Sequence, residues 1–75
     1  MRERIKQVIK DTLDLDYIPE NISRESCVKW DSMNHLQLLI GLESEFDVTF
    51  EPEDIFSMKT LDDIDKRIKL LKNFQ

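Results

Sequence analysis

The stretch from residue 32 to residue 46 constrains the fold of this chain more than any other part. Its apolar residues recur at helical spacing on two adjoining sides: Met33, Leu36, Leu38, Leu39, Ile40, Leu42 and Phe46. A helix that is apolar over so much of its circumference is expected at the centre of a helical bundle, with most of these side chains in the core. Met33 is the expected exception, an exposed and adaptable thioether near the helix start. Gly41 costs about 1 kcal/mol relative to alanine inside a helix, so its small size predicts close packing against another element.

Three further segments show helical patterns. Residues 4–13 form one amphipathic pattern, and Pro52 suits the first turn of a short helix whose inward side is Ile55, Phe56 and Met58. Thr60 and Asp63 approximate a capping box, which predicts a last amphipathic helix that ends near Phe74. Residues 47–50 have no partner strand elsewhere in the chain and are expected to form a loop.

A long connection joins the first two predicted helices. Between residues 14 and 29 the turn signals are Pro19, Asn21 and Ser23, and the expected apolar anchors are Tyr17, Ile18, Ile22 and Val28. The acids of this connection do not form a calcium loop, because Ile18 and Pro19 stand where an oxygen ligand and a glycine are required. Connections of this length are usually functional or pinned to the domain.

These patterns predict that residues 1–75 form a single all-α domain, a small four-helix bundle of three main helices and one short helix, with a long first loop. A chain this short buries only about 60% of its unfolded surface, so a large enclosed active site is not expected. Cys27 is the one cysteine, cannot form an internal disulfide and is expected to pack as a small hydrophobe.

Charge is distributed unevenly along the chain. Residues 11–65 carry fifteen of the sixteen acidic residues and three basic ones, a local charge of −12, whereas residues 1–10 and 66–75 carry +3 and +4. Such a field repels nucleic acids and anionic membranes and steers association with basic protein surfaces. No apolar run approaches the roughly 20 residues of a membrane span, and no signal-peptide core follows the charged N-terminus. We therefore expect a cytoplasmic monomer whose partners are proteins.

The start of the central helix carries the candidate site. Asp31 is a good N-cap residue, because its carboxylate can accept hydrogen bonds from the free N–H groups of the first turn. Ser32 then lies in that turn, where the helix dipole and the unpaired N–H groups favour an anion. A phosphodiester on the Ser32 hydroxyl would be well placed.

Asp31-Ser32-Met33, the apolar spacing that follows and the acidic helix end at Glu45-Phe46-Asp47 resemble acyl carrier proteins, and residues 50–72 resemble the family's short third and amphipathic fourth helices. The resemblance covers nearly the whole chain. It implies that Ser32 receives 4′-phosphopantetheine from coenzyme A, and that Asp31 helps a phosphopantetheinyl transferase engage its metal and substrate. It also implies a non-catalytic carrier, whose acyl group is held as a thioester while partner enzymes load, modify and remove it.

Two sets of residues are expected to contact these partners. The set beside the attachment site discriminates at close range: Met33, Asn34, His35 and Gln37. The acidic set near and beyond the end of the central helix steers basic docking surfaces at long range: Glu43, Glu45, Asp47, Glu51, Glu53 and Asp54. Trp30 and the uncharged residues after Ser32 depart from carriers of general fatty-acid synthesis and are more like specialised carriers of a dedicated pathway.

Catalytic and metal-binding roles fit these residues less well. Ser32, His35 and Asp31 could form a nucleophilic triad, but 75 residues hardly supply an oxyanion hole and a substrate cleft. His35 has no companion metal ligand, so no metal site is predicted, and a solvated histidine on the helix face is expected. Two alternatives stay open: an aminoacyl carrier such as a D-alanyl carrier, which shares the Asp-Ser-Met motif, and an acidic helical interaction module that is never modified.

Overall fold

The computed structural model describes residues 2–73, and this part of the chain is all-α, as the sequence predicts. Three main helices and one short helix follow each other: α1 (Arg2–Leu13), α2 (Ser32–Phe46), α3 (Pro52–Ser57) and α4 (Leu61–Asn73). The predicted bounds of α2 and the first-turn position of Pro52 are confirmed. Helix α4 is described to Asn73. Phe74, the predicted helix end, lies outside the described residues.

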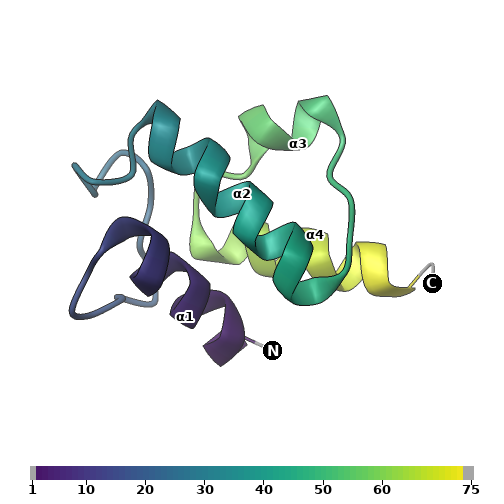
Figure 1. Cartoon of the computed structure of the whole chain (residues 1–75), viewed down its shortest axis with the longest axis horizontal. Coiled ribbons are helices and arrows are strands. Elements are labelled where there is room, and N and C mark those ends of the chain that lie inside the picture. Colours follow the sequence, from purple (N-terminus) through teal and green to yellow (C-terminus); the bar gives the residue numbers. More distant parts are fainter. Residues whose placement is uncertain (1, 74–75) are drawn as a thin grey trace.

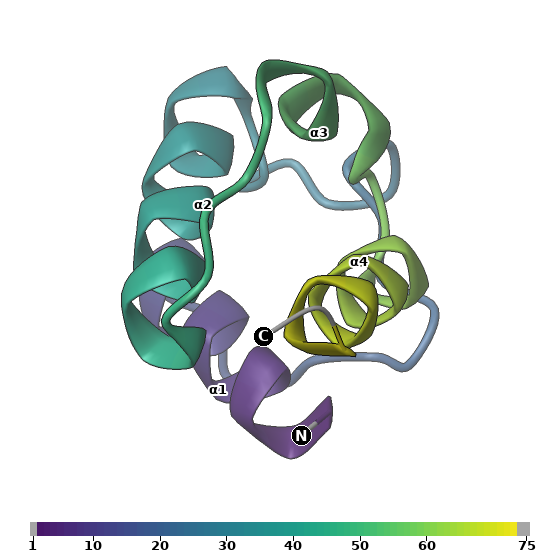
Figure 2. The ribbon, with the colours of Figure 1, turned by 90° about the vertical axis from the view of Figure 1, so that its right-hand side faces the viewer.

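The helices surround one apolar core, and α2 forms one side of it (Figure 2). Helix α1 runs in the opposite direction to α2 and packs against both α2 and α4, while α3 packs against α2 (Figure 1). The fully buried side chains come from these elements and from the loops between them: Ile5, Ile9, Leu13, Trp30, Leu38, Leu42, Met58, Leu61, Ile64 and Ile68. The large indole of Trp30 therefore belongs to the core, although it lies in the first loop.

Gly41 occupies the contact between α1 and α2, which confirms the close packing predicted from the sequence. A Cβ atom at this position would lie 3.2 Å from Cγ1 of Val8. This separation is tighter than ordinary van der Waals contact, so an alanine at this position would require the Val8 side chain to shift by a few tenths of an ångström.

Several apolar residues lie outside the core in which the sequence places them. Leu36 and Ile40 on α2 are 49% and 59% exposed, and Phe56 on α3 is 74% exposed rather than facing inward. The expected anchors Tyr17 and Val28 are exposed as well. The reason is geometric, since α1 and α3, which pack against α2, cover only part of its circumference. One side of the central helix, together with α3, is left as an apolar surface.

The long first loop is pinned to the bundle by its backbone. Ser23 forms an isolated antiparallel bridge with Thr60, the N–H of Arg24 donates to the carbonyl of Lys59 at 2.9 Å, and the N–H of Leu61 donates to the carbonyl of Ile22. Ile18 and Ile22 are buried, as predicted. Cys27 packs against the core, which confirms its predicted role. These bonds fix the loop beside the start of α2.

Ion pairs close the opposite side of the bundle. The guanidinium of Arg2 contacts the carboxylates of Glu20 and Asp62 on the surface and lies 2.7 Å from Oδ2 of the buried Asp65. Arg2 therefore joins α1, the first loop and α4.

None of the four helices in the described part has both the length and the apolar character that crossing a membrane requires.

Candidate functional site

The start of α2 is capped as the sequence predicts. Asp31 has an extended backbone, with φ −88° and ψ −176°, and its Oδ1 accepts the N–H of Asn34 at 2.9 Å. Ser32 is the first residue of the helix and is exposed. The side-chain amide of Asn34 also donates to the carbonyl of Lys29 at 2.7 Å. The serine hydroxyl is therefore presented to solvent from a rigid helix start.

Trp30 and His35 form a buried hydrogen-bonded pair beside this serine. The indole Nε1–H of Trp30 donates to Nδ1 of His35 at 2.9 Å, and His35 Nε2 lies 2.6 Å from the carbonyl oxygen of Ile55 on α3. Because an indole N–H can only donate, Nδ1 is the acceptor, and Nε2 carries the proton that it donates to Ile55. The neutral imidazole thus ties the start of α2 to α3.

The expectation of a solvated His35 is wrong, because only 2% of the residue is exposed. Burial lowers the pKa of the imidazole below its ordinary value of 6.5, the hydrogen bond to Ile55 opposes this effect, and the positive charge of Arg24 adds to it. His35 also offers no surface for close-range contact with a partner protein. The sequence does not reveal this, because a single polar residue four positions after a cap fits an exposed helix face equally well.

A mainly apolar hollow of about 340 Å³ adjoins Ser32 between α2 and α3. Its lining consists of Arg24, Ser32, His35, Leu36, Ile55 and Phe56. A second apolar hollow continues along α2 and shares Leu36 and Ile55 with the first. The exposed apolar side of α2 is therefore grooved rather than flat, and the groove begins at the serine.

Arg24 is the cation of this site, and it was not among the residues predicted to form it. Its Nη2 lies 3.5 Å from Oγ of Ser32, although eight positions separate the two residues. The other arginines of residues 2–73 pair with carboxylates: Arg2 with Glu20, Asp62 and Asp65, Arg4 with Glu45, and Arg67 with Asp54. No periodicity signals the position of Arg24, because it depends on how the first loop is pinned to the bundle.

The residues that flank Ser32 form an exposed surface of mixed character. Met33 is 74% exposed, as predicted, and Gln37 is exposed beside it, while Asn34 is half-buried by its capping contacts. The structure adds Leu36, Ile40 and Phe56 to this surface. Met33, Leu36, Ile40 and Phe56 are called the α2–α3 apolar surface below. The sequence signal that could have found it is the excess of apolar residues around α2.

Only some residues of the predicted acidic set are exposed to solvent. Glu51 and Glu53 are exposed at the start of α3, and Asp47 is exposed in a left-handed conformation at the end of α2, with φ 54°. Glu45 is exposed but lies 2.9 Å from Nη2 of Arg4, and the half-buried Glu43 accepts the N–H of Phe50.

Asp54 does not belong to that exposed set, which corrects the prediction. It is 5% exposed, its Oδ1 lies 2.9 Å from Nε of Arg67, and its Oδ2 accepts the N–H of Glu51 at 2.7 Å. This carboxylate caps α3 and joins it to α4. An acid in a first turn can serve either role, and only the position of Arg67 decides between them.

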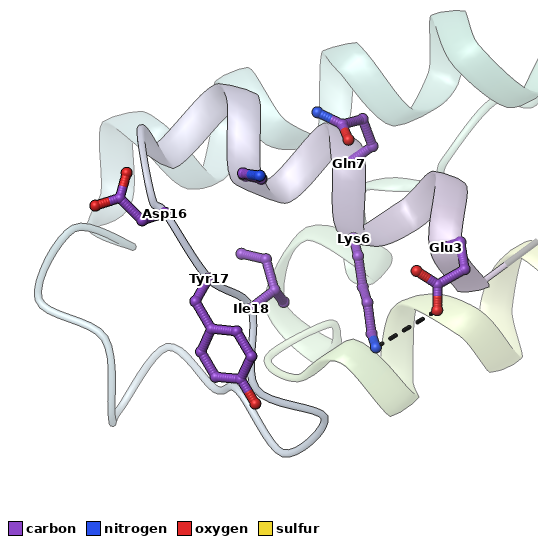
Figure 3. Close-up of a pocket in the computed structure, with 7 residues that line it drawn as sticks. Glu3, Lys6, Gln7, Asp16, Tyr17 and Ile18 are labelled. Carbon is purple, nitrogen blue, oxygen red and sulfur yellow. Dashed lines mark ion pairs between the residues drawn. The ribbon is translucent and has the colours of Figure 1, made fainter.

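A further hollow, of about 260 Å³, lies between α1 and the first loop and contains none of the predicted site residues (Figure 3). Charged and polar side chains of α1 line it, with Tyr17 and Ile18 on the loop side. Lys6 forms an ion pair with Glu3 at its edge. Among the described residues, no group of three or more histidine, cysteine or acidic side chains is placed to hold a metal ion.

Comparison with known proteins agrees with this arrangement. No family model matches the chain. The chain is 36% identical over 62 residues to an acyl carrier protein of Petrotoga mobilis, an alignment that covers 80% of this chain and 73% of that protein. It is 30% identical over 66 residues to an acyl carrier protein of Thermosynechococcus vestitus, covering 83% and 79%.

A solved structure from Mycobacterium tuberculosis, provisionally described as an acyl carrier protein, superposes with a TM-score of 0.83 at 28% identity and covers 92% of this chain and 95% of that one. Sequence and fold thus agree over most of the length of the chain. The chain belongs to the acyl carrier protein family.

Proposed function

We propose that this member of the acyl carrier protein family carries its acyl group as a thioester on 4′-phosphopantetheine attached to Ser32. The observation that carries the proposal is the exposed Ser32 hydroxyl at the capped start of the central helix, in a chain that matches acyl carrier proteins over most of its length. Partner enzymes then load, modify and remove the acyl group, and the carrier itself presents it.

Attachment is a phosphoryl-type group transfer. A bond forms between Oγ of Ser32 and the phosphorus that bears pantetheine in coenzyme A, the pyrophosphate P–O bond breaks, and the adenosine bisphosphate and the Oγ proton leave. When bound, the group supplies the terminal thiol that forms the thioester.

The residues at the start of α2 fit this group. Ser32 is exposed, Asp31 holds the helix start through Asn34, and the guanidinium of Arg24 faces the oxygen that would bear the negative phosphodiester. The role of Asp31 in engaging the transferase is part of this proposal.

An apolar acyl cargo agrees better with the site than an aminoacyl cargo. The hollow beside Ser32 is lined mainly by apolar side chains of Leu36, Ile55 and Phe56, and its charged lining residue is Arg24. An α-ammonium group would lose hydration there and would be repelled by the guanidinium, whereas an alkyl chain would gain by leaving water. The aminoacyl carrier is therefore the second candidate, supported by the Asp-Ser-Met motif alone.

The attachment site can be tested by intact mass. The purified chain is incubated with coenzyme A and a broad-specificity phosphopantetheinyl transferase, and the expected result is the mass increase of a single phosphopantetheine. Ser32→Ala should abolish this increase and retain a folded protein, because a first-turn hydroxyl at the surface contributes less than about 0.5 kcal/mol. Ser44→Ala, which removes another exposed serine of α2, is the matched control and should be modified normally.

Modification that persists in Ser32→Ala would disprove the site, and an unmodified wild type would favour the acidic interaction module. The cargo is identified separately, from the mass of the thioester recovered with the protein from native cells. An alkyl or oxidised alkyl acyl group is expected there, and an amino acid would establish the second candidate.

A further inference from the structure

The environment of Arg24 points to a function that the attachment site alone does not require. Among the arginines of residues 2–73, Arg24 is the one whose guanidinium forms no ion pair with a carboxylate. This is unexpected in a chain of sixteen acidic and eleven basic residues. The adjacent Glu25 is exposed and pairs with no basic side chain of that described range either. The guanidinium faces Oγ of Ser32 at 3.5 Å instead.

The position of Arg24 is set by the backbone on which it stands. Its N–H donates to the carbonyl of Lys59 at 2.9 Å, and the preceding residue, Ser23, bridges to Thr60. The turn that follows is closed by hydrogen bonds between Ser23 and Ser26. The residue is half-buried, so its side chain emerges from a fixed base into the hollow at Ser32. Preorganisation of this kind lowers the ordering cost of binding.

A neutral hydroxyl at 3.5 Å is a weak partner for a guanidinium, whose donor fork matches phosphate oxygens. The hollow offers no carboxylate in its place, since its other lining residues are the neutral His35 and apolar side chains. The guanidinium of Arg24 is therefore not neutralised by any carboxylate that lines this hollow.

We propose that Arg24 binds the phosphodiester of the modified protein, so that the first loop and the prosthetic group hold each other in place once Ser32 is modified. This inference rests on the proposed function, because the anion is the one attached at Ser32. It assigns to the loop a role that depends on the modification state. The apo protein has a hydroxyl in front of Arg24, whereas the modified protein has a charge-assisted pair.

The test compares apo and modified protein in four versions: wild type, Arg24→Gln, Arg24→Lys and the control Lys29→Gln. Lys29 is an exposed cation of the same loop whose Nζ contacts the carbonyl of Asp14, so its substitution removes one positive charge near Ser32 without touching the hydroxyl. Melting temperatures are measured for both forms at low and moderate salt. Phosphorus NMR of the modified forms reports the environment of the phosphodiester.

The change in melting temperature on modification should be more favourable in wild type and Lys29→Gln than in Arg24→Gln, with Arg24→Lys between them. Added salt should reduce this difference. The phosphorus shift should move in Arg24→Gln and stay unchanged in Lys29→Gln. A purely structural role of Arg24 would lower the melting temperatures of apo and modified Arg24→Gln equally, and that outcome would overturn the proposal.

The two proposals fail in different ways. If wild type gains no mass with coenzyme A and the transferase, the proposed function is rejected, and this inference with it. If wild type is modified but its phosphorus shift and its change in melting temperature equal those of Arg24→Gln, only the role of Arg24 is rejected. Should Arg24→Gln not fold, Arg24→Lys and the Nε–H signal of Arg24 in wild type, which should shift on modification, decide the question.

Discussion

At the scale of single residues, His35 has the environment that departs furthest from its expected one. Its two ring nitrogens are both engaged, one by the indole of Trp30 and one by the carbonyl of Ile55. Protonation would place an N–H on Nδ1 against the N–H of Trp30, so the folded state requires the neutral ring. The same contacts hold α3 against α2 and thereby shape the hollow at Ser32.

A pH dependence of stability follows from this pair. Burial lowers the pKa of His35 in the folded state below the 6.5 of the unfolded chain, so the unfolded state binds more protons. The free energy of unfolding should have its full value above about pH 6.5. It should decrease as the pH is lowered through and below that value, because His35 must bind its proton at a cost in the folded state. Urea unfolding followed by the fluorescence of Trp30, the single tryptophan, measures this between about pH 5 and pH 8.

His35→Gln is the control for that prediction. An amide side chain can accept from Trp30 and donate to Ile55 but does not titrate in this range. The variant should therefore lose the part of the pH dependence that lies just below pH 6.5, whatever its overall stability. Equal pH slopes for wild type and His35→Gln would show that the imidazole does not set the dependence.

At the scale of elements, the two sides of α2 have different environments. Leu38 and Leu42 are fully buried in the core, whereas Leu36 and Ile40 belong to the α2–α3 apolar surface. Exposed apolar patches of this kind mark sites of interaction with other proteins. The helix thus holds the bundle together on one side, and we infer that its other side, beginning at Ser32, contacts partner enzymes.

Two substitutions on α2 distinguish these sides. Leu38→Ala should destabilise the protein by about 2–5 kcal/mol, because it leaves a cavity in the core. Ile40→Gln should change the free energy of unfolding by less than about 0.5 kcal/mol, since the residue is already 59% exposed. Ile40→Gln should nevertheless slow acyl loading by a partner enzyme. A large destabilisation by Ile40→Gln would mean that this side of α2 is covered in solution.

At the scale of the whole molecule, charge is organised by the fold rather than by position in the chain. The basic residues of α1 fold back onto acids far along the sequence: Arg2 onto Glu20, Asp62 and Asp65, and Lys6 onto Glu20. The net charge nevertheless stays at −5. Self-repulsion among the remaining acids opposes the compact state.

Salt is therefore expected to raise the melting temperature of the wild type by screening this repulsion. Arg2→Gln should lower the melting temperature more than Arg4→Gln, because Arg2 faces three carboxylates, one of them buried, and Arg4 pairs with the exposed Glu45. Moderate salt should restore more of the loss in Arg2→Gln. Melting in a salt series measures both effects, and an unchanged wild-type melting temperature would contradict the repulsion.

The local elements of this protein follow from its sequence alone. The bounds of α2, the cap at Asp31, the first-turn Pro52 and the tight contact at Gly41 depend on periodicity, capping chemistry and side-chain size, which act within a few residues. The candidate serine could be named for the same reason, since its position at a capped helix start is a local property.

Tertiary structure alone decided which residues surround that serine. Periodicity places Leu36, Ile40 and Phe56 on apolar faces of their helices. It does not predict whether another helix or loop covers those faces. Burial of His35 and Asp54 depends on partners that lie 20 and 13 positions away, Ile55 and Arg67. Arg24 reaches Ser32 because the first loop pairs with the segment before α4. Long-range contacts of this kind are set by how the whole chain packs, so no local pattern predicts them.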